Sequence, residues 1–574
     1  MRIFRLLAFA LAWPLAPLRA AEEALVALPP FLVEEAAKGP PWRFATAPGY
    51  EILSRCSDAV TRRVVATHQR LHLLLAEILP VSLQLQCSLP RTLILYDEEL
   101  QPAASREVIA RMLQQDAPAP AADSMPTSGL RGLRAPGPVR RMSFLPNLRL
   151  WDSDAMTVFM IVRREDFDAE TLSLTKDYVS FLVKGRLPSL PPWFAAGFIT
   201  LYGQTTYEGE RLLMEPLEWI SAAHTAAVKT DPKTAPLVAP LGDFFALRTV
   251  PHDESDGVDP MKAWQAQAAL FVRWGLEAEG GAHRAALWKF TELAAVRGAS
   301  EELFTTCFGF DFAAAQARLT AYLPTAVRKT ATFRLARNTP KPAPIELRHA
   351  TDGEIARIKG DWERLEVPYV KKISPALASK YLEQARRTFR RAYDRDDRDP
   401  RLLAAMGLCE IDAGDTAAGH ALLESAARLG PIRPRANQEL ARLRLAAARA
   451  QPAGAEGQLA IDQVAGVLQP AFAARADRPA LAEVYETIAE VWAWSAPRAT
   501  RGHLAVLDEG VRLFPRRTSL VLRAAEVNLR HGFTTEAATF LALAERLPLS
   551  DEERARAAAL RLVVADLLPA SGRE

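Results

Sequence analysis

Two neighbouring segments decide the fold assignment of this chain: L-T-K-D-Y-V-S-F-L at residues 174–182 and L-P-P-W-F-A-A-G-F-I-T-L-Y at residues 190–202. The first segment has apolar residues three and four positions apart, which is the spacing of one buried helix face. These residues are Leu174, Tyr178, Phe181 and Leu182. The opposite face carries the polar residues Lys176, Ser180 and Lys184. Taken alone, the pattern predicts an amphipathic surface helix, followed by a segment whose Trp193 and Phe194 enter a core.

The residues around these segments predict strands first and helices afterwards. Residues 42–56 have the pattern of a strand pair, Asp58 can cap the helix that follows, and residues 91–96 form another apolar strand. The run M-T-V-F-M-I-V at residues 156–162 predicts a buried strand. Residues 261–323 repeat apolar positions at helical spacing and include F-G-F-D and A-Y-L. The order is therefore a β-α-β opening, further strands, the two decisive segments and a helical subdomain.

In this order, residues 42–323 resemble the gluzincin zinc peptidases, and specifically the bacterial peptidase MA-like branch. The stretch P-x-W-F-x-x-G is the most specific part, with Trp193, Gly197 and Tyr202 as its scaffold positions. The resemblance implies an α+β, zincin-like domain over residues 21–325. In this family one helix carries His-Glu-x-x-His, whose two His project from one face and bind zinc together. A Glu in Trp-x-x-Glu-Gly supplies the third ligand.

The chain departs from the family at every one of these chemical positions. Lys176 stands where the first His is expected, and its cationic amine would repel a divalent metal. Asp177 replaces the Glu that takes a proton from zinc-bound water and is shorter by one methylene. Ser180, a poor zinc ligand, replaces the second His, and Ala196, which has no donor atom, replaces the third-ligand Glu. The sequence therefore predicts no catalytic residue, no bound zinc and no other cofactor.

The other histidines, cysteines and acids leave alternatives open. His68 and His72 lie four residues apart in the first helix, a spacing that could bind metal, but His68 also falls on the apolar stripe of a core helix. Cys56 and Cys87 flank that helix and could form a disulfide or remain buried thiols. The acidic loop at residues 252–259 could collect calcium, although a solvated loop is the simpler explanation.

The N-terminus predicts a signal peptide over residues 1–20. Arg2 and Arg5 precede an apolar run that is too short for a comfortable membrane span, and Ala20 is a small residue suited to cleavage. We therefore expect an exported protein, periplasmic or extracellular, with no transmembrane segment. Loss of the signal peptide lowers the formal net charge from +3 to zero. A neutral chain gives no reason to expect nucleic acid as a partner.

The C-terminal part predicts tetratricopeptide-like helical repeats over residues 373–566. Pro400 and Pro434 stand 34 residues apart, which is the period of stacked helix hairpins. Small and turn residues recur at the same offsets in two units. They are Gly407, Gly414, Gly419, Leu423 and Ala426 in one unit, and Ala525, Gly532, Ala537, Leu541 and Ala544 in the other. Residues 114–139 are expected to be a mobile loop, and residues 326–372 a linker that contains one strand.

Together these features predict an exported, non-catalytic pseudopeptidase or scaffold. It would bind protein or peptide partners through its helical repeats and through a vestigial cleft. One alternative is an active zinc-dependent metallopeptidase with a non-standard site. Another is a structural envelope component in which only the repeats matter. The sequence has no G-x-S-x-G and no Gly-rich phosphate loop that would indicate a different enzyme class.

Overall fold

The computed structural model describes most of the chain. The described residues are 39–79, 90–97, 142–143, 148–162, 172–173, 176, 179–180, 183, 186–203, 205–208, 210–231, 239–246, 259–334, 342–373 and 375–567. Several predictions fall outside this set. They concern the signal peptide at 1–20, the loop at 114–139, the acidic residues 252–258, Asp177 and Cys87.

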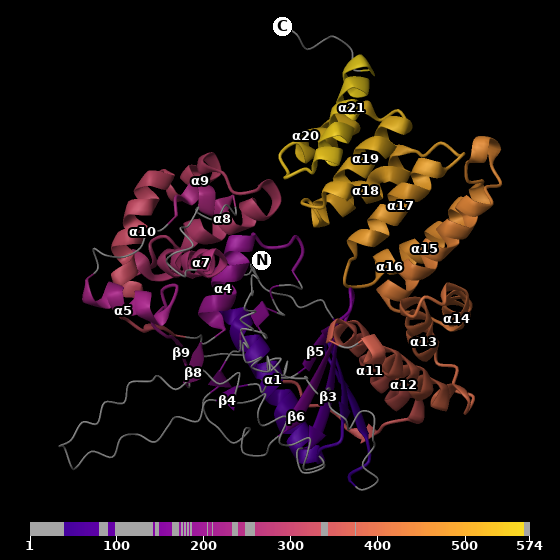
Figure 1. Cartoon of the computed structure of the whole chain (residues 1–574), viewed down its shortest axis with the longest axis horizontal. Helices are drawn as coiled ribbons and strands as arrows, with labels where there is room; N and C mark the ends of the chain where they lie inside the picture. Colours follow the sequence, from indigo (N-terminus) through magenta and orange to yellow (C-terminus); the bar gives the residue numbers. More distant parts are fainter. Residues whose placement is uncertain are drawn as a thin grey trace, which may run out of the picture.

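A six-stranded mixed sheet forms one layer of the N-terminal domain (Figure 1). Its order is β11 (Arg348–His349), β1 (Arg43–Ala47), β2 (Tyr50–Ser54), β3 (Arg91–Asp97), β6 (Met156–Val162) and β5 (Leu148–Trp151). The central strands β2, β3 and β6 are parallel, and the outer pairs are antiparallel. Helix α1 (Asp58–Ile78) connects β2 to β3, which confirms the β-α-β opening. Ser57 caps this helix in place of Asp58, whose carboxylate accepts a hydrogen bond from Arg43.

The two faces of this sheet are covered by different helices. Alternate residues of β3 point to opposite faces, as the pleat of a strand requires. Leu93 shares a core with Val64 of α1, whereas Ile94 packs on the other side with Trp362 of α11 (Asp352–Ile373). Complete burial of a large apolar side chain contributes about 2 kcal/mol. Helix α11 is therefore an integral part of the N-terminal domain.

The prediction of a linker over residues 326–372 is wrong. The stretch contains the expected strand, β10 (Ala331–Arg334), but also β11 and the whole of α11 except its last residue. The prediction rested on the prolines at residues 340–344 and on the lack of a clear apolar period, which indicate irregular chain. Helix α11 forms nevertheless, because the sheet covers one of its faces and α12 (Pro375–Tyr393) packs against it.

A second sheet and a group of helices complete the N-terminal domain. The strand order is β10, β9 (Arg211–Met214), β8 (Thr206–Glu208), β7 (Leu172–Ser173) and β4 (Met142–Ser143). The helices are α4 (Pro192–Tyr202), α5 (Ala222–Thr230), α6 (Leu241–Phe245), α7 (Pro260–Glu277), α8 (Arg284–Arg297), α9 (Glu301–Phe308) and α10 (Phe312–Ala326), with a 3₁₀ turn at Ala278–Gly281. These elements are those of an α+β domain. In the F-G-F-D stretch, Gly309 ends α9 at φ +81° and Asp311 caps α10.

The C-terminal part is a helical repeat array that continues from α11 and α12 (Figure 1). Its further helices are α13 (Pro400–Asp412), α14 (Thr416–Leu429), α15 (Pro434–Ala450), α16 (Ile461–Ala476), α17 (Ala482–Trp494), α18 (Arg501–Leu513), α19 (Thr518–Arg530), α20 (Thr534–Ala544) and α21 (Asp551–Leu567). Pro400 and Pro434 are the first residues of α13 and α15, so the 34-residue spacing is a structural repeat. A Cβ on Gly419 would lie 2.9 Å from the carbonyl oxygen of Gly407, which explains why small residues occupy this helix crossing. No helix among the described residues has the length and apolar composition needed to cross a bilayer.

A charged cluster joins the sheet to the helical array. Its members come from the turn between β5 and β6, from α11, and from the ends of α13 and α15. They are Asp152, Asp154, Asp361, Asp412, Arg364, Arg433 and Arg435. All three guanidinium groups donate to Asp152, and Arg433 also donates to Asp154 at 3.0 Å. The backbone N–H of Arg435 donates to Asp154 at 2.9 Å, so this carboxylate also caps α15.

The cluster is buried enough for its charges to depend on one another. The side chains of Asp152 and Arg364 are only 2% and 1% exposed. Burial by itself would raise the pKa of Asp152, but the three guanidinium groups outweigh it and hold that pKa well below its usual range. Removal of one partner from such a cluster leaves a buried charge uncompensated, which costs more than the intact cluster contributes.

The first prediction concerns this cluster. We expect Asp152→Asn to lower the free energy of unfolding by about 3 kcal/mol, because the substitution keeps the side-chain size but removes the charge shared by three arginines. Chemical denaturation at neutral pH measures the loss. Asp551→Asn is the matched control, since Asp551 pairs with Arg554 in solvent and should matter little. Equal effects of the two substitutions would contradict the role of the cluster.

A second prediction concerns pH and the buried acids Glu363 and Glu366 of α11, each 1% exposed. Burial raises the pKa of Glu363 to about 7 from a usual value of 4.5, although Thr388 and Lys359 lower it. The folded state therefore favours the neutral acid, and the stability it contributes is lost as pH rises from 4.5 to about 7.

Glu363→Gln imitates the neutral form, so it should raise the melting temperature at pH 8 and change it little at pH 4.5. Thermal melts at both pH values test this expectation. Glu383→Gln, on the exposed face of α12, should shift both melts equally. A shift for Glu363→Gln that is the same at both pH values would show that its ionisation does not affect stability.

Candidate functional site

The positions expected to carry zinc chemistry lie around α4. Lys176 is an exposed helical residue whose Cα lies against Gly203, because a Cβ on Gly203 would be 2.7 Å from it. This contact places Lys176 at the C-terminal end of α4, seven residues beyond Ala196, or about 10 Å along a helix axis. Ser180 is helical and half-buried, and Ala196 packs against the main apolar core.

The scaffold positions of the motif serve packing. Trp193 is 1% exposed and its ring lies 5.3 Å from that of Phe271 on α7. Gly197 lies at the crossing of α4 and α7, where a Cβ would be 2.4 Å from the carbonyl oxygen of Ala268. Tyr202 is 1% exposed, and burial raises the pKa of its hydroxyl above its usual value. The contacts of Trp193 and Gly197 are all with residues of the core, so packing alone accounts for these positions.

A pocket of about 300 Å³ lies beside Lys176. Thr200 and Leu201 of α4, Glu215 and Glu218 after β9, and Lys262 of α7 contribute to its lining. The described lining contains no His or Cys and mixes two ammonium groups with two carboxylates, a poor donor set for zinc. Within the described part of the chain, no group of three His, Cys, Asp or Glu side chains could hold a metal ion. The residues present therefore do not fit the zinc that the resemblance would imply.

The other candidate ligands are placed as core residues. His68 is 4% exposed and its ring meets that of Tyr50 edge-on at 5.3 Å. The side chain of His72 lies outside the described set. Cys56 is a buried free thiol, and burial raises its pKa to about 12, so the thiol carries its proton at neutral pH.

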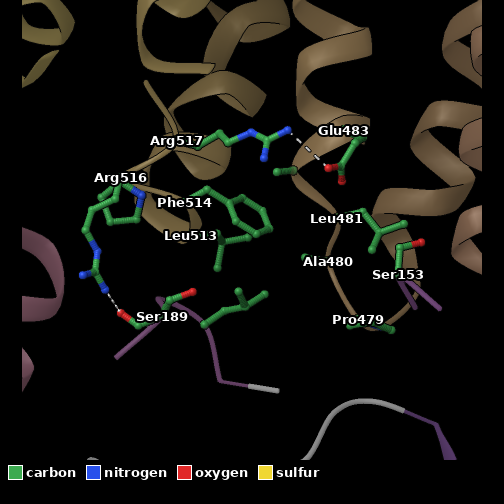
Figure 2. Close-up of a pocket in the computed structure, with 13 residues that line it drawn as sticks. Ser153, Ser189, Pro479, Ala480, Leu481, Glu483, Leu513, Phe514, Arg516 and Arg517 are labelled. Carbon is green, nitrogen blue, oxygen red and sulfur yellow. Dashed lines mark hydrogen bonds and ion pairs between the residues drawn. The ribbon is translucent and has the colours of Figure 1, made fainter. Parts of the chain in front are cut away.

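A larger pocket of about 450 Å³ lies where the N-terminal domain meets the repeats (Figure 2). We call it the junction pocket. Its walls are Ser153 in the turn between β5 and β6, Leu187 and Ser189 before α4, residues 479–483 at the start of α17, and residues 513–517 from the end of α18 to the start of α19. Its larger apolar side chains are Leu187, Pro479, Leu481, Leu513, Phe514 and Pro515. Leu187 also packs against the apolar core of the C-terminal helices.

Two adjacent arginines at this pocket differ in their partners (Figure 2). Arg517 donates to Glu486 at 3.0 Å and to Glu483 at 3.4 Å. Arg516 donates to the backbone carbonyls of Ser189 and Leu190 and pairs with no carboxylate among the described residues. Burial lowers the pKa of Arg516, and no acid in the described part of the chain offsets that effect. The junction pocket thus combines apolar side chains, the ion pair of Arg517 with Glu483, and Arg516, which has no carboxylate partner among the described residues.

The sequence did not indicate the junction pocket. Its lining residues are separated by up to 364 positions in the chain, and the decisive contact joins Arg516 to Ser189 across 327 positions. The only local signal is the pair Arg516–Arg517 after Phe514–Pro515, which is common in helix connections. The smaller pocket beside Lys176 lies near the positions expected to carry zinc chemistry, and the vestigial cleft stays a prediction.

Comparison with known proteins gives limited similarity. No protein-family model and no curated protein matches the chain. A thermophilic TPR protein of Thermus thermophilus is 20% identical over 33% of this chain and 94% of its own, with a TM-score of 0.23. The pilF protein of Pseudomonas aeruginosa is 14% identical over 38% of this chain and 96% of its own, with a TM-score of 0.25. TM-scores this low do not establish a shared fold. The evidence for helical repeats is therefore the helix pairs of this chain and the 34-residue spacing between them.

The third prediction concerns the motif scaffold. Gly197→Ala should lower the free energy of unfolding by about 1–3 kcal/mol, because the new methyl group collides with the backbone of α7. Urea denaturation measures the change. Gly466→Ala in α16 is the control, since a Cβ there meets nothing within 4 Å and should leave stability unchanged or higher. A neutral Gly197→Ala would mean that the crossing of α4 and α7 adjusts without strain.

Proposed function

We propose that the protein is an exported, non-catalytic scaffold that binds a peptide segment of a protein partner at the junction pocket. In this proposal the N-terminal domain is a zincin-like domain that has lost its metal. The helical repeats supply most of the binding surface. The observation that carries the proposal is the apolar junction pocket next to Arg516, a half-buried cation with no carboxylate partner among the described residues.

The absence of catalysis is supported by side-chain chemistry. Lys176, Ser180 and Ala196 offer no zinc ligand, so no residue at these positions could hold a metal to activate water. The family scaffold around them persists because Trp193 and Gly197 are needed for the core. In this proposal the fold is retained without the zinc ligands, and the function belongs to another site, the junction pocket.

The class of ligand follows from the junction pocket. A volume of about 450 Å³ is within the range of small-ligand pockets and can accept one or two side chains of a peptide. Leu481 and Phe514 favour an apolar side chain. Arg516 favours a neighbouring carboxylate, since a guanidinium binds it through charge-assisted hydrogen bonds. The expected ligand is a peptide with an apolar residue followed by an acidic one.

The fourth prediction tests this ligand class. Fluorescein-labelled synthetic peptides would carry one leucine followed by aspartate, asparagine or lysine in an otherwise alanine and serine background. Fluorescence anisotropy with the full protein should give several-fold tighter binding for aspartate than for asparagine, and weakest binding for lysine. Arg516→Gln should remove the preference for aspartate, whereas Arg516→Lys should retain part of it because the charge remains.

Arg512→Gln is the matched control, because Arg512 is an exposed residue of α18 outside the pocket lining. It should keep the preference for aspartate. Binding without any carboxylate preference, or an unchanged preference in Arg516→Gln, would refute the proposed site. Cleavage of the peptides that a chelator abolishes would instead support the alternative of a metallopeptidase with a non-standard site.

A further inference from the structure

A third pocket, of about 400 Å³, lies at the seam between the six-stranded sheet and the first helix pair of the array. Its walls come from residues 39–42 before β1, from Arg55 after β2, and from α11 and α12. It does not share a lining residue with the junction pocket. Nothing in the proposed function uses it.

The described lining of this pocket is strongly basic. Four of its side chains are cationic, and one is a carboxylate. The cations are Arg55, Lys359, Arg391 and Arg395, and the carboxylate is Asp352. Asp352 already accepts a hydrogen bond from Arg395. The pocket therefore has an excess of positive charge over the acids that line it.

Two of these cations are held in place within the fold. Arg55 is 7% exposed and Lys359 is 5% exposed, although such residues rarely lie so deep. Both lie 5.8 Å from the centre of the Trp42 ring, Arg55 from the end of β2 and Lys359 from α11. Arg55 also donates to the carbonyl of Pro40 at 3.3 Å. These contacts fix the positions of charges that would otherwise remain solvated.

The third cation is available to a ligand. Arg391 is an exposed residue of α12 and forms no ion pair with any described residue. The hydroxyl of Thr388, one helical turn earlier, also lines the pocket. The buried acid Glu363 lies close enough to Lys359 and Arg391 for both to lower its pKa, yet burial raises that pKa to about 7. Glu363 is therefore a weak counter-charge at neutral pH.

We propose that this basic pocket binds a small, multiply charged oxyanion, whose phosphate or carboxylate groups are held by Arg55, Lys359 and Arg391. The size of the pocket admits a small molecule. Guanidinium and ammonium groups together suit oxyanions, because the first binds two oxygens at once and the second acts as a point charge. A bound anion would also link the six-stranded sheet to the helical array, because Arg55 follows β2 and Arg391 belongs to α12.

The fifth prediction tests the pocket with two probes on the full protein. Isothermal titration calorimetry with sodium pyrophosphate and with citrate should show saturable binding of at least one probe at a single site. Tighter binding of pyrophosphate would identify phosphate as the recognised group, and tighter binding of citrate would identify carboxylate. Arg391→Gln should weaken that binding by about tenfold, the usual loss for a charge-assisted hydrogen bond.

Two further variants keep the test decisive. Arg390→Gln removes the same charge from the neighbouring exposed residue outside the pocket lining, and binding should be unchanged. Asp352→Asn removes the one lining carboxylate, whose side chain is 64% exposed, and should tighten binding several-fold. The absence of binding for both probes would overturn the proposal. Equal losses in Arg390→Gln and Arg391→Gln would also overturn it, because they would indicate non-specific attraction to a basic surface.

Discussion

The charged cluster around Asp152 sets how the two parts of this protein fit together. Three arginines from α11 and α15 converge on one aspartate in the turn between β5 and β6, and Asp154 caps α15 beside it. A buried charge without its partners is far costlier than an exposed one, so alternative positions of the array are disfavoured. The turn of a strand pair thus determines where the third helix pair of the array begins.

Helix α11 also joins the sheet to the helical array, through apolar contacts. Trp362 closes the core of the sheet, while Gly360 on the same helix touches the ring of Phe389 on α12. One helix therefore contributes to both parts, to the core of the sheet through Trp362 and to the core of the first helix pairs through Ala356. The two pockets proposed as binding sites lie at the edges of this junction, where side chains from distant segments meet. This is a common location for ligand sites, because concave surfaces form where domains meet.

The segment around α4 contains positions that the core constrains and positions that it does not. Trp193 is surrounded by aromatic rings, and Gly197 is fixed by the backbone of α7, so both positions are constrained by the core alone. Positions 176 and 196 are less constrained, because Lys176 is exposed and Ala196 is only half-buried. Buried positions such as Trp193 and Gly197 therefore give information about the fold, whereas an activity has to be inferred from the polar positions.

The sequence by itself determined the features that depend on neighbouring residues. The apolar run of β6, the helical spacing over residues 261–323 and the 34 residues between Pro400 and Pro434 each reflect a local pattern, which the backbone imposes wherever an element is buried. Only the tertiary structure decided that residues 352–373 form a shared helix, that Arg433 meets Asp152 across 281 positions, and that Arg516 meets Ser189 across 327. Those contacts join segments that no local period relates, because burial and charge compensation act through space and not along the chain.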